Sequence, residues 1–289
     1  MRIIYSCFLI IACLFALTAP ASYAGALKVL YVPCKTVPTD MDLVEVGKVK
    51  EVLRANQLQL ENGAVFILDN IRVPVPYERD AREFLETLVK GKTVGLYSNK
   101  TLPQAGQADA HGNEIVHVVV DDGTWVQQTM VAKGYAWVDS TPNNRDCVNT
   151  LYKSEVVARA KKLGFWAAPE YKIHDHNSLN GTMGTFILFE GVPKVYRPYG
   201  EYDFYGFGYG ESQTQRSFTI ALKKSDEWMF STLVPNPQLR GFYAADLAHT
   251  RMRIRGWVEP FAISTATTPM IRLTHPEQLE FPEGLPGFK

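Results

Sequence analysis

The chain has 289 residues, enough for one large or two smaller domains, and its hydrophobic fraction of 46% is ordinary for a globular protein. Thirty basic residues balance thirty acidic ones, so the formal net charge is zero. Non-specific nucleic-acid binding draws most of its affinity from neutralised phosphates, and this chain has no excess of lysine and arginine to provide it. Nucleic acid is therefore a possible ligand that the charge does not favour.

Residues 1–24 predict a signal peptide for export. Arg2 precedes a long apolar run, and small residues stand before Gly25, where cleavage is expected. The pattern is that of a secretory signal and not of a transmembrane span, so we expect a periplasmic or secreted protein. Lipid anchoring at Cys13 is a minor alternative, because the apolar run continues beyond that cysteine.

Two cysteines remain after the expected cleavage, Cys34 and Cys147. An even pair in an oxidising compartment favours a disulfide, which would tie the N-terminal segment to the first domain. Two separate buried thiols are the alternative. Neither cysteine is part of a Cys-x-x-Cys motif, so we expect no metal or redox role.

Residues 25–46 contain few periodic apolar positions and predict an N-terminal arm. Strand and helix patterns alternate after it. Asn62-Gly63 is typical of a hairpin turn, and Gly134 is typical of a glycine that ends a helix. The expected elements are strands over 47–54, 58–60, 65–68, 93–97 and 115–120, and helices over 77–89, 126–133 and 147–162. The last helix is expected to turn Leu151, Val156 and Ala160 to one face.

A second run of strand patterns begins after Pro169. It follows a polar linker at 174–180 and includes segments 184–196, 217–222, 251–259 and 270–280. These strands predict a second small barrel over residues 181–281. Its Arg-x-Arg-Gly-Trp-Val-Glu and Ile-x-Leu-Thr-His-Pro-Glu-Gln segments resemble the small barrel that accompanies nuclease-like domains in some secreted bacterial proteins.

The segment from Gly134 to Trp166, GYAWVDSTPNNRDCVNTLYKSEVVARAKKLGFW, resembles the closing strand, loop and last helix of the staphylococcal nuclease (thermonuclease) family. The resemblance implies an oligomer-binding (OB) fold, a five-stranded Greek-key barrel, over residues 47–173. The expected fold class is therefore α+β, mainly β, with this nuclease-like OB barrel followed by a second OB-like β-barrel.

The same resemblance implies that the catalytic motifs are degenerate. The family uses carboxylates to hold calcium and arginines to stabilise charge on the phosphoryl oxygens. Aligned on its motifs, the metal-binding carboxylates become Asn56 and Arg72, and the two arginines become Ile67 and Asn113. The threonine and the water-orienting glutamate become Val73 and Val75, so no ligand set is left at these positions.

A rebuilt site is the alternative. It would need Asp69, Glu78, Asp80 or Asp109 to converge in one cleft with an arginine such as Arg72, Arg79 or Arg82. Charges at 78–83 instead have the spacing of the solvated face of a helix.

Three groups in the second half are candidate binding residues. Tyr199, Tyr202 and Tyr205 could stack on bases or sugars, or cap the barrel. Arg251, Arg253 and Arg255 project from one face of a strand and could contact an anion, or pair with nearby acids. His174-Asp175-His176 could hold a metal, although a solvated linker is the simpler interpretation and we expect no metal.

We therefore expect an exported, non-catalytic binding or scaffolding protein without a cofactor. Its partner would be a protein or an oligomeric ligand bound on a barrel face. A secreted nuclease with a rebuilt site, which would use calcium, and an envelope assembly or structural protein are the alternatives.

Overall fold

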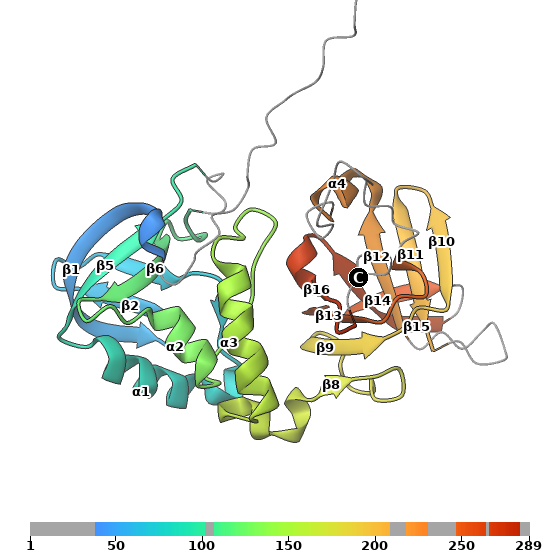
Figure 1. The fold of residues 1–289 in the computed structure, drawn as a ribbon, viewed down its shortest axis with the longest axis horizontal. Helices are drawn as coiled ribbons and strands as arrows, with labels where there is room; N and C mark the ends of the chain where they lie inside the picture. Colours follow the sequence, from blue (N-terminus) through green and yellow to red (C-terminus); the bar gives the residue numbers. More distant parts are fainter. Residues whose placement is uncertain (1–37, 102–106, 209–217, 231–246, 264–265, 284–289) are drawn as a thin grey trace, which may run out of the picture.

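The computed structural model describes residues 38–101, 107–208, 218–230, 247–263 and 266–283. They form two lobes, with the helix α3, Val148–Ala160, between them (Figure 1). The expected signal peptide, most of the N-terminal arm and Cys34 lie outside the described residues. No helix in the described part of the chain is long and apolar enough to span a membrane.

The first lobe is built on a closed barrel with strand order β1-β2-β3-β6-β5. Most neighbours pair antiparallel, whereas β3 and β6 run parallel. The strands are β1 Asp42–Arg54, β2 Gln57–Leu60, β3 Val65–Leu68, β5 Thr93–Ser98 and β6 Glu114–Val120. The predicted mixed α+β fold with a closed barrel is confirmed.

The first strand is longer than the sequence pattern indicated. It begins at Asp42 rather than Gly47, because residues 42–48 pair with β5 while residues 49–54 pair with β2. Shifts in register let this one strand serve both neighbours. At Gly47 a Cβ would lie 2.6 Å from Cδ1 of Leu60, so a side chain at this position would require Leu60 to shift.

Three helices cover the barrel: α1 Glu78–Val89, α2 Val126–Ala132 and α3. The predicted buried face of α3 is wrong. Val156 and Ala160 are exposed, whereas Glu155 is fully buried beside Leu151. The helix turns this carboxylate inward, where it accepts from the Val138 N–H of the first lobe and from Arg255 of the second.

The second lobe consists of two sheets, and no closed barrel is present within its described residues. The five-stranded sheet has the order β10-β11-β12-β15-β14, with β12 and β15 parallel. The four-stranded sheet has the order β16-β13-β9-β8. The strands are β8 Ile173–His174, β9 Phe186–Gly191, β10 Val195–Tyr199, β11 Tyr202–Phe207, β12 Phe218–Lys223, β13 Met252–Trp257, β14 Glu259–Ile263, β15 Ala266–Leu273 and β16 Leu279–Glu280, with a short helix α4 at Glu227–Phe230.

The two sheets enclose one core. Phe189 of β9 packs on Phe207 and Phe218 of the other sheet, with ring centroids 4.9 and 4.1 Å apart. The expected linker also contributes to this lobe, because β8 pairs parallel with β9 and His174 is buried. The second lobe therefore begins directly after the last turn of the first.

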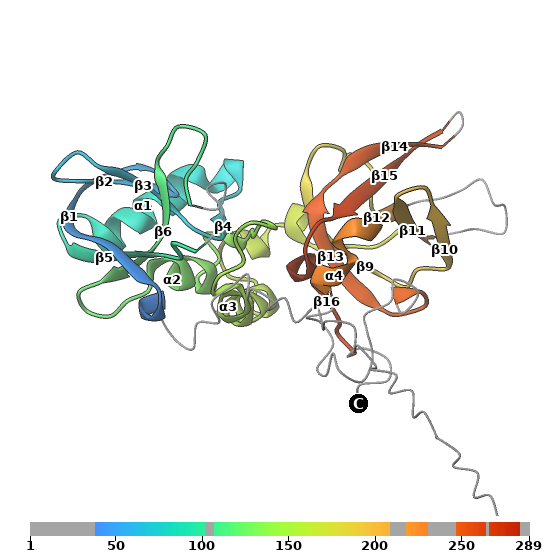
Figure 2. The same ribbon diagram turned by 90° about the horizontal axis from the view of Figure 1, so that it is seen from above.

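An aromatic cluster joins the lobes. Trp137 lies in β7, Trp137–Val138, which pairs with β4, Ile71–Arg72. Its ring stacks on Phe186 of the second lobe at 4.8 Å and meets Phe165 edge-on at 5.4 Å. Buried ring contacts of this kind hold the lobes side by side, as both ribbon views show (Figures 1 and 2).

Candidate functional site

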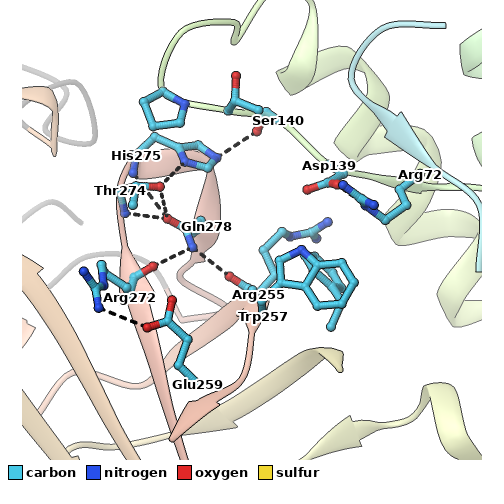
Figure 3. Close-up of a pocket in the computed structure, with 14 residues that line it drawn as sticks. Arg72, Asp139, Ser140, Arg255, Trp257, Glu259, Arg272, Thr274, His275 and Gln278 are labelled. Carbon is cyan, nitrogen blue, oxygen red and sulfur yellow. Dashed lines mark hydrogen bonds and ion pairs between the residues drawn. The ribbon is translucent and has the colours of Figure 1, made fainter. Parts of the chain in front are cut away.

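A cleft of about 280 Å³ lies at the junction of the two lobes (Figure 3). The first lobe contributes Arg72 of β4 and the loop 139–142 that follows β7. The second lobe contributes Trp257 of β13, Glu259 of β14 and the end of β15 with the turn beyond it. Both lobes are therefore needed to form its walls.

Arg72 is placed in the cleft by the short β4–β7 pairing. Arg72 pairs with Trp137 in this register, and Asp139 follows the end of β7 directly. The guanidinium forms an ion pair with Asp139 and lies 5.2 Å from the centre of the Trp257 ring. Figure 3 shows the three side chains together on one wall. The charge of Arg72 is thus neutralised by a carboxylate of its own lobe, and its guanidinium stacks on an aromatic ring of the other lobe.

A second guanidinium stands on the opposite wall. Arg272 of β15 donates to Glu259 at 3.0 Å and lies 5.8 Å from the ring centre of Tyr202. The antiparallel β14–β15 pairing brings Glu259 and Arg272 within reach of each other. Arg272 is half exposed, and its Nη1 lies 3.5 Å from the Tyr202 hydroxyl.

The turn after β15 is fixed by one side chain. The Gln278 carbonyl accepts from the backbone N–H of Thr274 at 2.6 Å. Its amide donates to the carbonyls of Arg255 and Arg272 at 3.2 and 3.0 Å. Gln278 thereby attaches the turn Pro276–Gln278 to two strands, β13 and β15, that belong to different sheets.

His275 connects this turn to the first lobe. Its Nε2 lies 3.0 Å from the Ser140 hydroxyl (Figure 3). Burial foremost, together with the nearby charges of Arg145 and Arg255, lowers the pKa of His275 to about 3. The imidazole is therefore neutral at physiological pH and serves as a hydrogen-bonding contact between the lobes.

A buried ion network lies behind the cleft. Arg255 of β13 donates to both oxygens of Glu155 at 2.8 and 3.0 Å and to Glu280 at 2.7 Å. Arg159 of α3 also reaches Glu280, at 2.9 Å. Burial alone would raise the pKa of Glu280, but Arg255 and Arg159 lower it to about 2. The carboxylate is charged throughout the physiological range.

Two further contacts cross the junction on the same side. Arg145 donates from two nitrogens to the two oxygens of Glu277, each at 2.6 Å, and both side chains are buried. The Tyr152 hydroxyl donates to the Glu277 carbonyl. Bidentate arginine–carboxylate pairs have a fixed geometry, so these contacts set the orientation of one lobe against the other.

The charges in the cleft are balanced within the chain. Each guanidinium already has a carboxylate partner, so an anion would have to compete with Asp139 or Glu259. A ligand with an apolar face and hydroxyl or amide groups would instead find the Trp257 ring and spare N–H groups. Among the residues described, no group of three or more His, Cys, Asp and Glu side chains could hold a metal ion.

Residues 56–168 match the family model for Staphylococcal nuclease homologue. The matched segment covers most of the closed barrel and all three helices around it. This part of the chain is a staphylococcal nuclease-like domain. No curated protein matches the chain.

The positions to which the resemblance assigns catalytic roles lie around the barrel of the nuclease-like domain. Asn56 is in the turn between β1 and β2, and its carbonyl accepts from the Leu68 N–H at 2.8 Å. Asn113 donates to Asp109 at 3.0 Å. Ile67 and Val73 are half-buried, and Val73 packs against the barrel core, whereas Val75 is 87% exposed. Only Arg72 of the six lines the cleft.

The four carboxylates of the rebuilt-site alternative each have a local partner, and none lines the cleft. Glu78 accepts from the Ala55 N–H at 2.8 Å, and Asp80 lies 3.4 Å from the neighbouring Arg79. Asp109 accepts from the N–H groups of His111 and Asn113 within its own loop. These contacts stabilise turns and a helix start.

Asp69, the fourth carboxylate, is buried inside the nuclease-like domain. It accepts from the Asn144 amide at 2.8 Å and lies 3.4 Å from Nε2 of His117. Burial raises the pKa of Asp69 to about 7; hydrogen bonds from Asn144 and Asn70 lower it, and the charge of Asp146 raises it further. Burial lowers the pKa of His117 to about 3.

The candidate arginines, Arg253 and Arg255 in β13 and Arg251 directly before it, are all paired with carboxylates of the chain. Arg255 is in the buried network, and Arg253 donates to Glu190 and Glu280. Arg251 is exposed and pairs with Glu190 and Glu283. The period-two spacing was read correctly as one strand face, but that face meets acidic side chains.

The three candidate tyrosines lie on two different faces of the sheet. Tyr205 is fully buried in the second core, so its ring is not available to a ligand. Tyr199 and Tyr202 lie opposite each other on β10 and β11, on the other face of the sheet. Alternation along β11 could have predicted this difference, because residues 202 and 205 are an odd number of positions apart.

The side-chain hydrogen bonds of His174 and Asp175 in the histidine-rich linker are local. Nδ1 of His174 lies 2.7 Å from the Ser178 carbonyl, and Asp175 accepts from the Asn177 N–H at 3.0 Å. Burial of His174 follows from its place in β8.

The sequence reading missed Glu155, Asp139 and Trp257. Glu155 lies in the Gly134–Trp166 segment that carries the family resemblance, but a helical carboxylate is usually solvated, and the sequence gave no sign of its partners. Trp257 lies in the Arg-x-Arg-Gly-Trp-Val-Glu segment of the second lobe, directly after the three candidate arginines. Asp139 follows Trp137-Val138 directly, and only the β4–β7 pairing brings it to Arg72.

Proposed function

We propose that this is an exported, non-catalytic nuclease-like protein that works as a binding or scaffolding module through the cleft between its lobes. The observation that carries the proposal is the position of Arg72. The family resemblance assigns a metal-binding carboxylate to this position, and Arg72 instead pairs with Asp139 beneath the Trp257 ring.

A guanidinium at a metal position opposes catalysis directly. Calcium needs several oxygen ligands, and a fixed positive charge repels a divalent cation at short range. Asp139, the nearest carboxylate, already neutralises Arg72. A second lobe that covers this position leaves a cleft with stacking and hydrogen-bonding groups, which suits ligand binding better than phosphodiester hydrolysis.

The test is a nuclease assay on the purified mature chain with single-stranded DNA and RNA, with and without calcium. We expect no calcium-dependent cleavage. As a matched comparison, R72D returns a carboxylate to this position, where it would also face Asp139. Calcium-stimulated cleavage that co-elutes with the wild-type protein and is lost in D69N or D80N would overturn the proposal and support a rebuilt active site.

Export is supported by the sequence of residues 1–24. Cell fractionation with an antibody to the mature chain tests it. Recovery in the periplasm or medium, with residues 1–24 removed, is expected. Full-length protein confined to the cytoplasm would contradict it.

A further inference from the structure

A line of aromatic rings leads out of the cleft across the second lobe. Trp257 is 46% exposed at the cleft. Arg272 also lines the cleft, and its Nη1 lies 3.5 Å from the hydroxyl of Tyr202. Tyr202 lies opposite Tyr199 in the β10–β11 register, and Tyr199 is 76% exposed. Trp257, Glu259 and Arg272 line the same cleft, Arg272 contacts Tyr202, and Tyr202 is paired with Tyr199. These five residues are called the aromatic track here.

The track lies on an ordered part of the lobe. Phe204 of β11 stacks on Phe261 of β14 with ring centroids 5.2 Å apart, although two strands separate β11 from β14 in the sheet. This contact joins β11 to the edge strand β14 on the side that carries Tyr202. Rings fixed before binding lose little conformational entropy when a ligand arrives.

Resting on the proposed binding function, we propose that the aromatic track binds a neutral or weakly charged polysaccharide strand. A sugar ring has an apolar C–H face that stacks on an aromatic side chain and hydroxyl groups around its edge. Trp257, Tyr202 and Tyr199 provide the stacking faces. Arg272 and Glu259 lie between them and offer donors and acceptors for the hydroxyls.

The charge distribution favours a glycan over a single-stranded nucleic acid. Stacking proteins that bind nucleic acid combine aromatic rings with a positively charged groove. Here Arg272 pairs with Glu259 at 3.0 Å, and Lys223 lies 3.8 Å from Glu201. A phosphate backbone would meet these carboxylates as well as the cations. Hydroxyl groups can hydrogen-bond to such pairs without separating them.

The proposal is tested by calorimetric titration of the mature chain with chitohexaose and cellohexaose, and by co-sedimentation with purified peptidoglycan sacculi. We expect saturable binding of at least one of the three glycans. Y199A and W257A should each weaken it about tenfold or more, the usual effect of losing an aromatic anchor. W228A is the matched control, because Trp228 is 52% exposed but does not line the cleft.

Y199A keeps the test valid if W257A disturbs the junction, since Tyr199 is exposed and far less confined. Unchanged thermal midpoints establish that the variants are folded. Binding to none of the three glycans would overturn the proposal, as would wild-type affinity in both Y199A and W257A. Saturable binding of a twenty-residue oligothymidylate without glycan binding would also overturn it, while the proposed non-catalytic function would stand or fall on the calcium assay alone.

Discussion

Arg255 and Glu155 form a bidentate ion pair across the junction of the two lobes, at 2.8 and 3.0 Å, with both side chains buried. Glu155 also accepts from the Val138 N–H at 2.7 Å, so a single carboxylate holds α3, β7 and β13 together. Burial alone would lower the pKa of Arg255, but Glu155 foremost, with Glu280, holds it well above its ordinary value.

Replacing Glu155 by glutamine should destabilise the protein strongly. The amide can still accept a hydrogen bond but cannot neutralise Arg255, and breaking a buried pair usually costs about 3 to 5 kcal/mol. The free energy of unfolding from denaturant titration measures the loss. E61Q is the control, because Glu61 pairs with Lys48 on the surface and such pairs contribute about 1 kcal/mol or less. Equal stability of E155Q and E61Q would show that the network does not hold the lobes together.

The buried Asp69 should give the protein an unusual response to pH. Its folded pKa of about 7 exceeds its ordinary value of 3.8, so its stabilising contribution is complete below about pH 4 and is lost as the pH rises through 7. D69N, which is neutral at every pH, should therefore gain stability relative to the wild type between pH 4 and 7. The slope is at most about 1.4 kcal/mol per pH unit.

His117 should oppose this trend. Its pKa is lowered from 6.5 to about 3, so its contribution is present above about pH 6.5 and is lost as the pH falls toward 3. The two groups offset each other in the wild type between about pH 4 and 6.5, and D69N should expose the loss due to His117. Denaturation midpoints measured from pH 4 to 9 test this. A difference between D69N and wild type that does not change with pH would contradict it.

Gly134 and Gly164 should be intolerant of side chains. Both have positive φ, and a Cβ on Gly164 would lie 2.1 Å from the Gly134 carbonyl oxygen. The Phe165 N–H donates to that same carbonyl at 3.0 Å, so the backbone cannot move away without losing the bond. G164A should lower the free energy of unfolding by about 3 kcal/mol or more.

Gly181 provides the control for this substitution. It also has positive φ, but a Cβ there meets no atom within 4 Å. G181A should therefore show only the smaller cost of the backbone conformation, about 1 kcal/mol. Equal losses in G164A and G181A would mean that strain, and not the close backbone approach, decides both positions.

The processed protein should begin at Gly25 and carry a disulfide between Cys34 and Cys147. Cys147 is buried at the start of α3, and Cys34 lies outside the described residues. Intact mass of the exported protein, with and without reductant and alkylation, tests both expectations. Two alkylated thiols without reductant would contradict the disulfide.

The first barrel was predictable because its strands are local and strongly patterned. Leu58 and Leu60 alternate with polar residues and are fully buried, and the Asn62-Gly63 turn pairs β2 with β3. The family resemblance then supplied the order of the strands. The early start of β1 was missed because residues 42–46 are only partly buried and carry no clear alternation.

The arrangement of the second lobe could not be read in the same way. Alternation tells which side chains share a face, but it does not tell which strands become neighbours. The parallel pairing of β12 with β15 joins residues about fifty positions apart, and β8 comes from a segment that reads as a polar linker. The cleft depends on these pairings, so only its individual residues, Arg255 and Arg72 among them, could be singled out from the sequence.

The ion pair between Glu155 and Arg255 also has a consequence for biosynthesis. Arg255 is translated 100 residues after Glu155, so in a nascent chain that has completed α3 the buried carboxylate can pair with Arg159 of its own helix, at 3.2 Å, but not with Arg255. The bidentate pair that joins the lobes can form only after β13 has emerged from the ribosome. Until then the inner face of α3 would stay accessible to chaperones and proteases. The delay would also leave time for export to begin while the chain is still unfolded.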